Sequence, residues 1–488
     1  MNRPSDRTAL AAILLLALAV RLWSVATHTY LAYPDETFQY LEPAHRLAFG
    51  SGVITWEFVE GIRSWLLPGA IAGAMRVAAL FADSPDTYIL PLRLLCVLAS
   101  LVVPFVGFRM VERQMGSWAG IAAGLLCALS PQAIYFAPVI MTEPLATDAA
   151  FLAIWLGERA SGTRRLLIAG ALFGLATALR YQYLPVLGLV ALWQHARDRR
   201  RRVLVLAGGS AVVLLVFGVL DTVTWGAPFR SVWSNFLRNG PDGISTAMGT
   251  GPWEYYFKYC LAAWGGLPVL LLVLGCALAP IWGIVIVGTL VLHTLVPHKE
   301  LRFIFLANAA IPIAVAIGLT HALRWLRVAR GRWLPVAAAS ALALLIAYQT
   351  ASNATDPDQW HRDRSMLQAI ATARAIPDAC GIAMRTVWVY RTGGYSYWHR
   401  DAPIYFESWE RAQNVPFTDF HLPLVDMLRG ETVPQYPDKE LAAHASKFNV
   451  IVGRRADGLA GFAERHCVGV GTPDDTEWCV FFRPGGCE

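Results

Sequence analysis

The sequence has few charged residues and very little lysine. Only 16% of its 488 residues are charged, and lysine supplies 4 of the 41 basic residues. Soluble domains carry about 25% charged residues, so this composition, with 56% hydrophobic residues and a mean hydropathy of +0.44, excludes an ordinary soluble protein. We therefore expect an integral membrane protein. Because an excess of arginine over lysine is typical of GC-rich bacterial genomes, we expect it in a bacterial inner membrane.

Motifs for metal and nucleic-acid binding are also missing. The eight cysteines form no CxxC pair, and no cysteine–histidine spacing is typical of zinc. The net charge of +6 comes from arginines clustered in short loops, which indicates membrane orientation rather than a nucleic-acid face. The sequence therefore predicts no nucleic-acid partner, no metal site and no cofactor.

Long hydrophobic runs are what the sequence has in abundance. The first, residues 8–27, is 20 residues long, which is enough to cross about 30 Å of hydrocarbon and too long for a signal-peptide core. With the later runs it gives 11 predicted membrane spans. The later runs lie at about 88–110, 118–139, 144–158, 166–183, 184–195, 203–223, 260–278, 280–297, 303–323 and 333–350.

The arginines in the loops predict the orientation. We interpret residues 65–82, which contain Pro68 and Arg76, as an amphipathic helix on the membrane surface rather than a span. The loops on the N-terminal side then carry 16 arginines, against 7 arginines and lysines in the opposite loops. Because basic residues concentrate on the cytoplasmic side, we expect the long loops and the C-terminal part outside the cytoplasm.

The C-terminal part, residues 351–488, has a different composition. It is polar and interrupted by Pro, Gly and Asp, with strand-like runs at 381–390, 448–453 and 478–483 and a helical pattern at 363–376. We therefore expect a small extracytoplasmic α/β domain in this part.

The predicted division is thus a polytopic α-helical membrane domain over residues 1–350, with an outer catalytic loop at about 28–87, and the α/β domain over 351–488. In an oxidising compartment, the four cysteines of the second domain allow three pairings, among which the sequence does not choose. These cysteines are Cys380, Cys467, Cys479 and Cys487.

Two adjacent carboxylates, Asp35 and Glu36, follow the first span in the segment YPDETFQYLEPAHRLAFG. An acidic residue at a helix start can simply cap the helix and favour its dipole. A second interpretation uses the position beside the bilayer, where a carboxylate can act as general base on a substrate whose lipid tail stays in the membrane.

Basic residues form a second cluster at the outer end of the ninth predicted span. His298, Lys299 and Arg302 lie in the segment LVPHKELRFIF, and Arg180 ends the fifth span on the same side. Such residues can merely reach from the interface toward water. They would also suit an anionic phosphate held at the membrane surface.

A third outer segment, residues 220–259, is rich in Gly, Pro, Trp and Tyr. It is typical of an interfacial aromatic belt, and its aromatic rings would also stack on sugars while Asn235 and Arg238 donate hydrogen bonds. Glu143, at the outer start of the fourth span, either caps its helix or binds substrate.

In this order, the clusters resemble the family-22 mannosyltransferases, membrane enzymes of the C-type glycosyltransferase fold that include enzymes extending lipid-linked oligosaccharides and GPI anchors. Such enzymes are identified by an HPDE-type motif, an arginine-serine-tryptophan-leucine run and a later HKE motif. Here these are YPDE at 33–36, GIRSWLLPG at 61–69 and PHKELRF at 297–303. The resemblance covers about residues 8–325, and Tyr33 departs from it where the family often has histidine.

The resemblance implies that Asp35 is the catalytic base with Glu36 in support, and that the HKE segment binds the donor phosphate. It also implies that Arg63 and Trp65 bind substrate. We expect inverting transfer of a sugar, mannose before others, from a polyprenyl-phosphate donor to a lipid-linked glycan or glycolipid acceptor. A lipid monophosphate leaves with less charge than a nucleotide diphosphate, so we expect no requirement for a divalent metal, although the sequence does not exclude one.

Three other interpretations stay open at this point. The same fold could transfer another sugar or act on protein. A lipid or sugar transporter would need ionisable groups near mid-membrane and matching half-repeats, and no such repeat is visible in the sequence. Finally, the C-terminal part could be a receptor module on an inactive membrane scaffold.

Overall fold

Two contact-defined units make up the chain, each from separate stretches of sequence. Unit 1 combines Met1–Thr27, Arg93–Phe229 and Gly249–Ser352; unit 2 combines His28–Leu92, Arg230–Met248 and Asn353–Glu488. The structure is a computed structural model. It describes residues 4–27, 31, 33–53, 55–158, 162–195, 200–240, 243–325, 336–342, 344, 363–387, 391–407, 435–436, 444–469 and 476–488.

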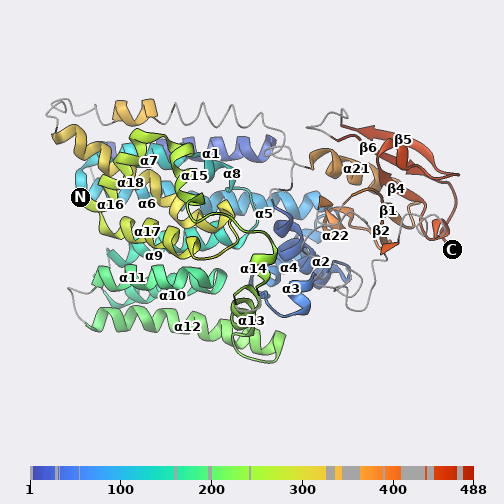
Figure 1. The fold of residues 1–488 in the computed structure, drawn as a ribbon, viewed down its shortest axis with the longest axis horizontal. Coiled ribbons are helices and arrows are strands. Elements are labelled where there is room, and N and C mark those ends of the chain that lie inside the picture. The colour runs from blue at the N-terminus through green and yellow to red at the C-terminus, as the bar shows by residue number, and fades with distance from the viewer. Residues whose placement is uncertain are drawn as a thin grey trace. The chain divides into compact units, whose positions relative to one another are not determined.

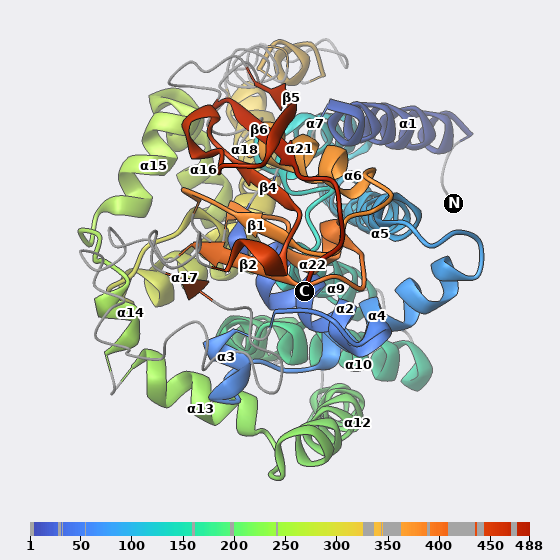
Figure 2. The same ribbon diagram turned by 90° about the vertical axis from the view of Figure 1, so that its right-hand side faces the viewer.

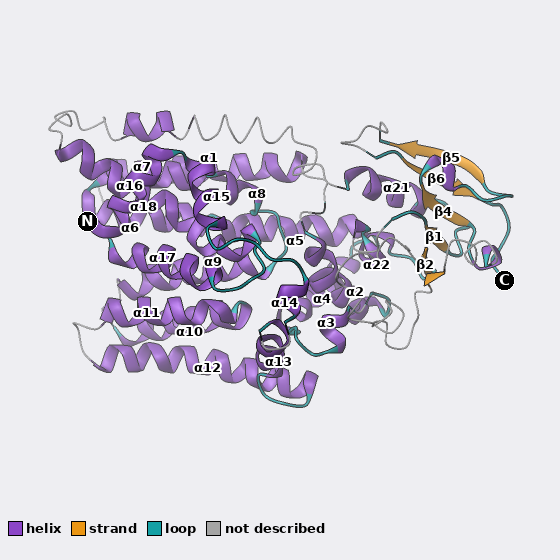
Figure 3. Cartoon of the chain, viewed as in Figure 1, coloured by secondary structure: helices purple, strands orange, loops and turns teal. Residues whose placement is uncertain are grey.

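Unit 1 is built from helices that run through the purple bundle of Figure 3. Its apolar sequence explains this, because helices satisfy their own backbone hydrogen bonds in lipid. Its longer helices are α1 (Pro4–Thr27), α6 (Val102–Met115), α7 (Ser117–Leu129), α9 (Thr142–Glu158), α10 (Thr163–Leu179), α11 (Leu184–His195), α12 (Arg200–Trp225), α15 (Tyr255–Trp264), α16 (Gly266–Leu278), α17 (Pro280–Thr294) and α18 (Phe305–Trp325). The shorter elements are α8 (Pro131–Tyr135), η2 (Tyr181–Tyr183) and η3 (Leu301–Ile304), and α5 (Pro85–Ser100) passes from unit 2 into unit 1.

By length and composition, four helices in the described residues can cross a membrane, or five if one bent pair is a single span. The four are Asp6–Thr27, Pro85–Met115, Arg201–Trp225 and Leu301–Trp325. The count of 11 spans stays a prediction, and most of the last predicted span, 333–350, lies outside the described residues.

The predicted span at 260–278 is not one continuous helix, and whether it crosses the membrane stays a prediction. The chain bends by 114° between α15 and α16. Gly265, at the break, has φ +77°, a backbone conformation that other residues rarely adopt. The apolar run therefore hides a turn, because hydrophobicity alone does not reveal a backbone angle.

Small residues let neighbouring helices of unit 1 approach closely. A Cβ at Gly170 of α10 would collide with the carbonyl oxygen of Leu206 in α12, and one at Gly209 with that of Leu167. These two helices lie side by side in Figure 1. Such close backbone approach through glycine is typical of membrane helix pairs.

Unit 2 combines short helices with one six-stranded sheet. Its helical elements are the π-helix η1 (Glu36–Leu41), α2 (Glu42–Phe49), α3 (Trp56–Val59), α4 (Leu66–Ala79), α13 (Arg230–Asn239), α14 (Ile244–Ala247), α21 (Arg364–Arg374), α22 (Gly394–Trp398), η7 (Ala445–Lys447) and η8 (Arg455–Asp457). The helix α4 matches the predicted amphipathic segment 65–82, with Ile71 and Met75 buried and Phe81 exposed just beyond it.

The sheet has the order β3-β2-β1-β4-β6-β5. Strands β3, β2, β1 and β4 are parallel, and β6 and β5 are antiparallel additions. Figure 2 shows the strands in orange to red with α21 beside them. The strands are β1 (Ile382–Met384), β2 (Ile404–Glu407), β3 (Gln435–Tyr436), β4 (Val450–Gly453), β5 (Ala463–Val468) and β6 (Trp478–Phe482).

The predicted strand regions 448–453 and 478–483 and the predicted helix are confirmed as β4, β6 and α21. The predicted region 381–390 contains β1, and its residues 388–390 lie outside the described residues. One face of α21, with Met366, Ala369 and Ile370, is buried against the sheet residues. β2, β3 and β5 were not predicted, since short or solvent-facing strands such as β5 have no apolar run.

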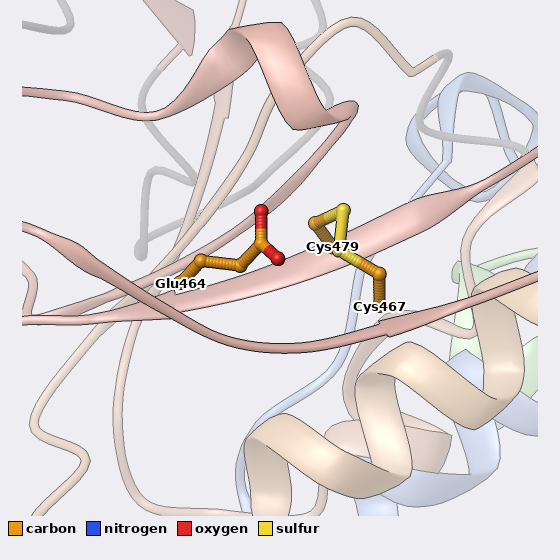
Figure 4. Close-up of side chains that lie close together, drawn as sticks. All are labelled: Glu464, Cys467 and Cys479. Carbon is orange, nitrogen blue, oxygen red and sulfur yellow. A yellow bond between two sulfur atoms is a disulfide. The ribbon is translucent and has the colours of Figure 1, made fainter.

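The four cysteines of the C-terminal part form two disulfides, one of the three pairings left open by the sequence. Cys380 pairs with Cys487, and Cys467 pairs with Cys479 across β5 and β6. Glu464 lies beside the second disulfide (Figure 4), and these three are the one group within the described residues whose side chains are close enough to share a metal ion. Because both sulfurs are in a disulfide, they are not thiolate ligands, so this group is no metal site.

Buried polar contacts join the segment after the first span to the C-terminal part within unit 2. Glu42 is fully buried; its Oε1 accepts hydrogen bonds from the amide and hydroxyl of Ser396, and its Oε2 accepts one from the amide of Val53. A Cβ at Gly394 would collide with the Glu42 carboxylate. The predicted boundary at residue 350 separates the part expected in the membrane from the part expected outside it, whereas the units are defined by contacts. The boundary therefore stays a prediction.

Candidate active site

Asp35 lies at the start of the π-helix η1 in unit 2. Its backbone is helical and its side chain makes no capping hydrogen bond to the helix, so its contacts do not support capping as its role. Glu36, the first residue of η1, is 1% exposed. Of the two carboxylates, Asp35 is the more accessible, which agrees with its predicted role as the base.

A third carboxylate, Glu57 of α3, lies near Asp35, and the sequence interpretation missed it. Glu57 is 7% exposed, and its Oε1 accepts a hydrogen bond from Gln39 Nε2 at 3.0 Å. Burial raises the pKa of Glu57, and the nearby charge of Asp35 raises it further, while Arg63 opposes both. No signal in a single sequence separates this residue from other acidic residues of the outer loop.

The predicted substrate residues Arg63 and Trp65 lie in the same unit, between α3 and α4. One guanidinium nitrogen of Arg63 lies 3.9 Å from Glu57 Oε1. The Trp65 ring packs on the ring of Phe58 with centroids 4.9 Å apart, and Trp65 immediately precedes α4. The motif at 61–69 therefore places a cation beside the carboxylate of Glu57.

Asn235 and Arg238 of α13 contact the same part of unit 2. Asn235 donates a hydrogen bond to the carbonyl of Ile62 at 3.2 Å, and Arg238 forms an ion pair with Glu60. These contacts give both side chains a role in holding the segment that carries Arg63. Their predicted binding of substrate stays a prediction.

In unit 1, the predicted phosphate-binding residues form one cluster, which we call the basic cluster: Arg180, His298, Lys299 and Arg302 with the carboxylates Glu143 and Glu300. Arg180 lies 3.1 Å and Arg302 lies 3.8 Å from Glu143 Oε1, and Glu143 is fully buried. Thus Glu143, predicted as a substrate contact, lies between the two arginines and positions them; direct contact with substrate stays a prediction.

Glu300 holds the other side of the basic cluster. It accepts hydrogen bonds from Arg302 at 2.5 Å and from His298 Nε2 at 2.8 Å. Burial by itself would raise the pKa of Glu300, but the charge of Arg302 and these hydrogen bonds hold it well below the usual value. Glu300 is therefore ionised at neutral pH.

Both ring nitrogens of His298 face hydrogen-bond acceptors. Nδ1 lies 2.9 Å from the carbonyl of Gly249, and Nε2 faces the Glu300 carboxylate. Only the doubly protonated imidazolium donates from both nitrogens. In agreement, the hydrogen bond with Glu300 raises the pKa of His298.

Lys299 differs from the other basic residues because its ammonium contacts backbone. Nζ donates to the carbonyls of His293 at 3.2 Å, Thr294 at 2.7 Å and Val296. These carbonyls lie at and just after the C-terminal end of α17, where a cation interacts favourably with the helix dipole. Lys299 therefore holds the turn, and its predicted role toward phosphate stays a prediction.

Aromatic residues that the sequence interpretation did not single out complete the basic cluster. The guanidinium carbons of Arg180 and Arg302 lie 5.4 Å and 5.3 Å from the ring centroid of Phe303, a distance typical of cation–π contacts. The hydroxyl of Tyr256 donates to the carbonyl of Glu300 at 3.2 Å. These contacts depend on tertiary packing, which the sequence does not display.

Three comparisons place the chain among known proteins. The model of the Alg9-like mannosyltransferase family matches residues 12–398. GPI mannosyltransferase 3 of Drosophila melanogaster is 30% identical over 335 residues, which is 64% of this chain and 56% of that protein. GPI mannosyltransferase 3 of Yarrowia lipolytica is 26% identical over 415 residues, 81% of this chain and 76% of that protein. The chain thus matches only a little over half of the fly protein.

Solved structures show the same fold at low sequence identity. ArnT from Cupriavidus metallidurans, bound to undecaprenyl phosphate, superposes with a TM-score of 0.62 at 13% identity, covering 96% of this chain and 97% of that one. The Archaeoglobus fulgidus oligosaccharyltransferase superposes with a TM-score of 0.53 at 12% identity, covering 82% and 64%. The predicted C-type glycosyltransferase fold is thereby confirmed, and the integral membrane class is supported by the family match and by helices long and apolar enough to cross a membrane.

The family match covers most of the chain and includes the YPDE, GIRSWLLPG and PHKELRF motifs from which the resemblance was inferred. The chain belongs to the Alg9-like mannosyltransferase family.

Proposed function

We propose that this protein transfers mannose from a polyprenyl-phosphate donor to a lipid-linked glycan or glycolipid acceptor, with inversion at the anomeric carbon. Family membership supports mannose as the sugar. The solved relative bound to undecaprenyl phosphate supports a polyprenyl carrier, since that protein has the same fold.

One observation carries the proposal, namely the excess positive charge of the basic cluster. Arg180 and Arg302 pair with two carboxylates, Glu143 and Glu300, while the ammonium of Lys299 donates to backbone carbonyls. The imidazolium of His298 adds a fourth positive charge. Two carboxylates cannot neutralise this set, so the cluster favours a phosphate group.

In the proposed reaction, Asp35 takes the proton from the acceptor hydroxyl as that oxygen attacks the anomeric carbon. The bond from the anomeric carbon to the phosphate oxygen breaks, and its electron pair leaves with the polyprenyl phosphate. The phosphate gains negative charge in this step. Arg302 and His298 would stabilise that charge, and such fixed electrostatic stabilisation is often the largest contribution to rate.

We further propose that unit 2 faces the extracytoplasmic side. Its two disulfides support this, since disulfides persist in oxidising compartments and are rare in the cytosol. The loop arginines of the sequence point the same way. The bacterial inner membrane is part of this proposal, although the named relatives are eukaryotic.

The experiment incubates the purified protein with radiolabelled polyprenyl-phosphate mannose and membrane extract, followed by identification of the labelled product. The proposal predicts a mannosylated lipid-linked product with inverted anomeric configuration. If only a different labelled sugar were transferred from a parallel set of polyprenyl-linked donors, mannose would be the wrong sugar. Movement of the donor across proteoliposomes without covalent transfer would contradict the enzyme proposal.

A further inference from the structure

Glu57 is a buried carboxylate whose two oxygens have different surroundings. Gln39 donates to Oε1 at 3.0 Å, and Arg63 lies 3.9 Å from the same oxygen. Oε2 is buried but accepts no hydrogen bond from any residue that the structure describes. The hydroxyl of Thr55 interacts with the carboxylate, yet neither that hydroxyl nor Oε2 has a hydrogen-bond partner among the described residues.

A buried carboxylate oxygen without a donor is costly. Leaving a buried acceptor unsatisfied costs about 1–3 kcal/mol, and more when it is charged. Glu42, another buried carboxylate of unit 2, does not show this: each of its oxygens accepts a hydrogen bond from Ser396 or Val53. A hydrogen-bond donor from a bound molecule would therefore satisfy an oxygen of Glu57 that the described residues leave without a partner.

The position of Glu57 limits which kind of hydrogen-bond donor can bind to its open oxygen. It lies close enough to Asp35 for the two negative charges to interact. A second anion, such as the donor phosphate, would be repelled there. A neutral hydroxyl would be favoured, because it donates to an ionised carboxylate in a charge-assisted hydrogen bond. Sugars carry several adjacent hydroxyls, so one can reach Glu57 while its neighbour reaches Asp35.

We propose that Glu57 is an acceptor-binding residue: its Oε2 accepts a hydrogen bond from a hydroxyl of the acceptor sugar next to the attacking hydroxyl, and Gln39 and Arg63 hold the carboxylate in place. This proposal rests on the proposed function. No proton moves to Glu57 in the reaction; the proton of the attacking hydroxyl goes to Asp35, and the leaving phosphate takes the electron pair of the broken bond.

The test uses Glu57→Gln, which keeps the size of the side chain and an oxygen for Gln39 but replaces the open acceptor by an amide NH2. We expect the KM for a defined lipid-linked glycan acceptor to rise about 10- to 100-fold, as for loss of one charge-assisted hydrogen bond. The KM for polyprenyl-phosphate mannose should stay within about twofold of the wild type, as expected for a residue that touches only the acceptor.

The matched control is Glu42→Gln, which changes a buried carboxylate of the same unit whose oxygens are both satisfied. It should lower the thermal midpoint and leave the acceptor KM unchanged. A second variant, Gln39→Met, removes the hydrogen bond to Oε1 and should raise the acceptor KM by a smaller factor, which keeps the test valid if Glu57→Gln does not fold.

The outcomes separate this inference from the proposed function. If the wild type transfers mannose while Glu57→Gln and Gln39→Met keep its acceptor KM, the inference is wrong and the proposed function stands. If Glu57→Gln lowers stability and raises the KM values for donor and acceptor equally, Glu57 is structural and the inference is also wrong. A wild type that transfers no mannose would contradict both.

Discussion

Two histidine side chains lie next to each other in unit 2, and one of them, His45, is buried. His45 of α2 is 1% exposed; its Nδ1 donates to the carbonyl of Ser51 at 2.5 Å, and its Nε2 lies 2.8 Å from His399 Nδ1. Burial lowers the pKa of His45 to about 4, although the hydrogen bond to Ser51 opposes the shift. The folded protein therefore holds His45 neutral, and protonation favours the unfolded chain.

This shift predicts a pH dependence of stability. Above the ordinary pKa of about 6.5, neither state binds the proton, and the contribution of His45 is fully present. As the pH falls from 6.5 toward 4, the unfolded chain binds a proton that the folded chain does not. Between pH 7.5 and 5, the wild type should lose about 2 kcal/mol more than His45→Gln, measured by denaturant unfolding in detergent. Equal losses in the two proteins would contradict the burial effect.

The basic cluster gives a second prediction for single residues. Arg302→Gln should weaken binding of polyprenyl phosphate about 10- to 100-fold, because one charge-assisted contact to phosphate is lost. Lys299→Met should weaken this binding less. It should also lower the thermal midpoint, because the ammonium of Lys299 donates to a carbonyl at the C-terminal end of α17. Binding is measured with labelled polyprenyl phosphate on purified protein. A larger binding loss for Lys299→Met than for Arg302→Gln would reverse this order of roles.

At the level of elements, glycine determines how closely helices of unit 1 pack. Gly170 of α10 has no room for a Cβ beside Leu206 of α12, whereas a Cβ at Gly188 of α11 meets no atom within 4 Å. Both residues lie within helices, where alanine is intrinsically favoured over glycine by about 1 kcal/mol. The two positions thus separate packing from helix propensity.

Gly170→Ala should therefore destabilise the protein by about 1–3 kcal/mol through overpacking. Gly188→Ala should be neutral or stabilising by up to about 1 kcal/mol. Thermal unfolding of the two variants in the same detergent measures the difference. If both substitutions shifted the midpoint in the same direction by the same amount, the close approach of α10 and α12 would not matter for stability.

The elements also show what sequence patterns reveal. Hydrophobic runs predicted α9, α11 and α12 with bounds close to those observed, because an apolar run of helical length has few alternatives in lipid. They did not predict the bend at Gly265, which depends on a backbone angle. For the site, Asp35 and Arg302 could be found because they lie in family motifs, whereas Glu57 lies in none of these motifs and is recognisable only from its three-dimensional contacts.

For the whole molecule, the disulfides make the proposed orientation testable. Cys380, Cys467, Cys479 and Cys487 form two disulfides, and the four other cysteines are thiols. Thiol titration of the denatured protein, without reductant, should find four thiols per chain, and eight after reduction. Eight thiols before reduction, in protein prepared from cells with an alkylating agent present, would place these cysteines in a reducing compartment.

Loss of a disulfide should also affect the whole unit that contains it. The Cys380–Cys487 bond joins residues 107 apart in sequence, and closing a loop of about this length restricts the unfolded chain strongly. The contribution belongs to unit 2, which also contains Asp35. The stability of the C-terminal strands and the position of the candidate base are therefore linked through contacts within unit 2, such as that between Glu42 and Ser396.

The central claim is that Asp35 takes the proton of the acceptor during mannosyl transfer. The most direct measurement is the rate of transfer from radiolabelled polyprenyl-phosphate mannose by the wild type, Asp35→Asn and the exposed control Asp86→Asn. Loss of a general base lowers rates by about 100- to 10,000-fold. The account predicts such a loss for Asp35→Asn, with the thermal stability of that variant unchanged, and a wild-type rate for Asp86→Asn. A folded Asp35→Asn protein with the wild-type rate would contradict the account.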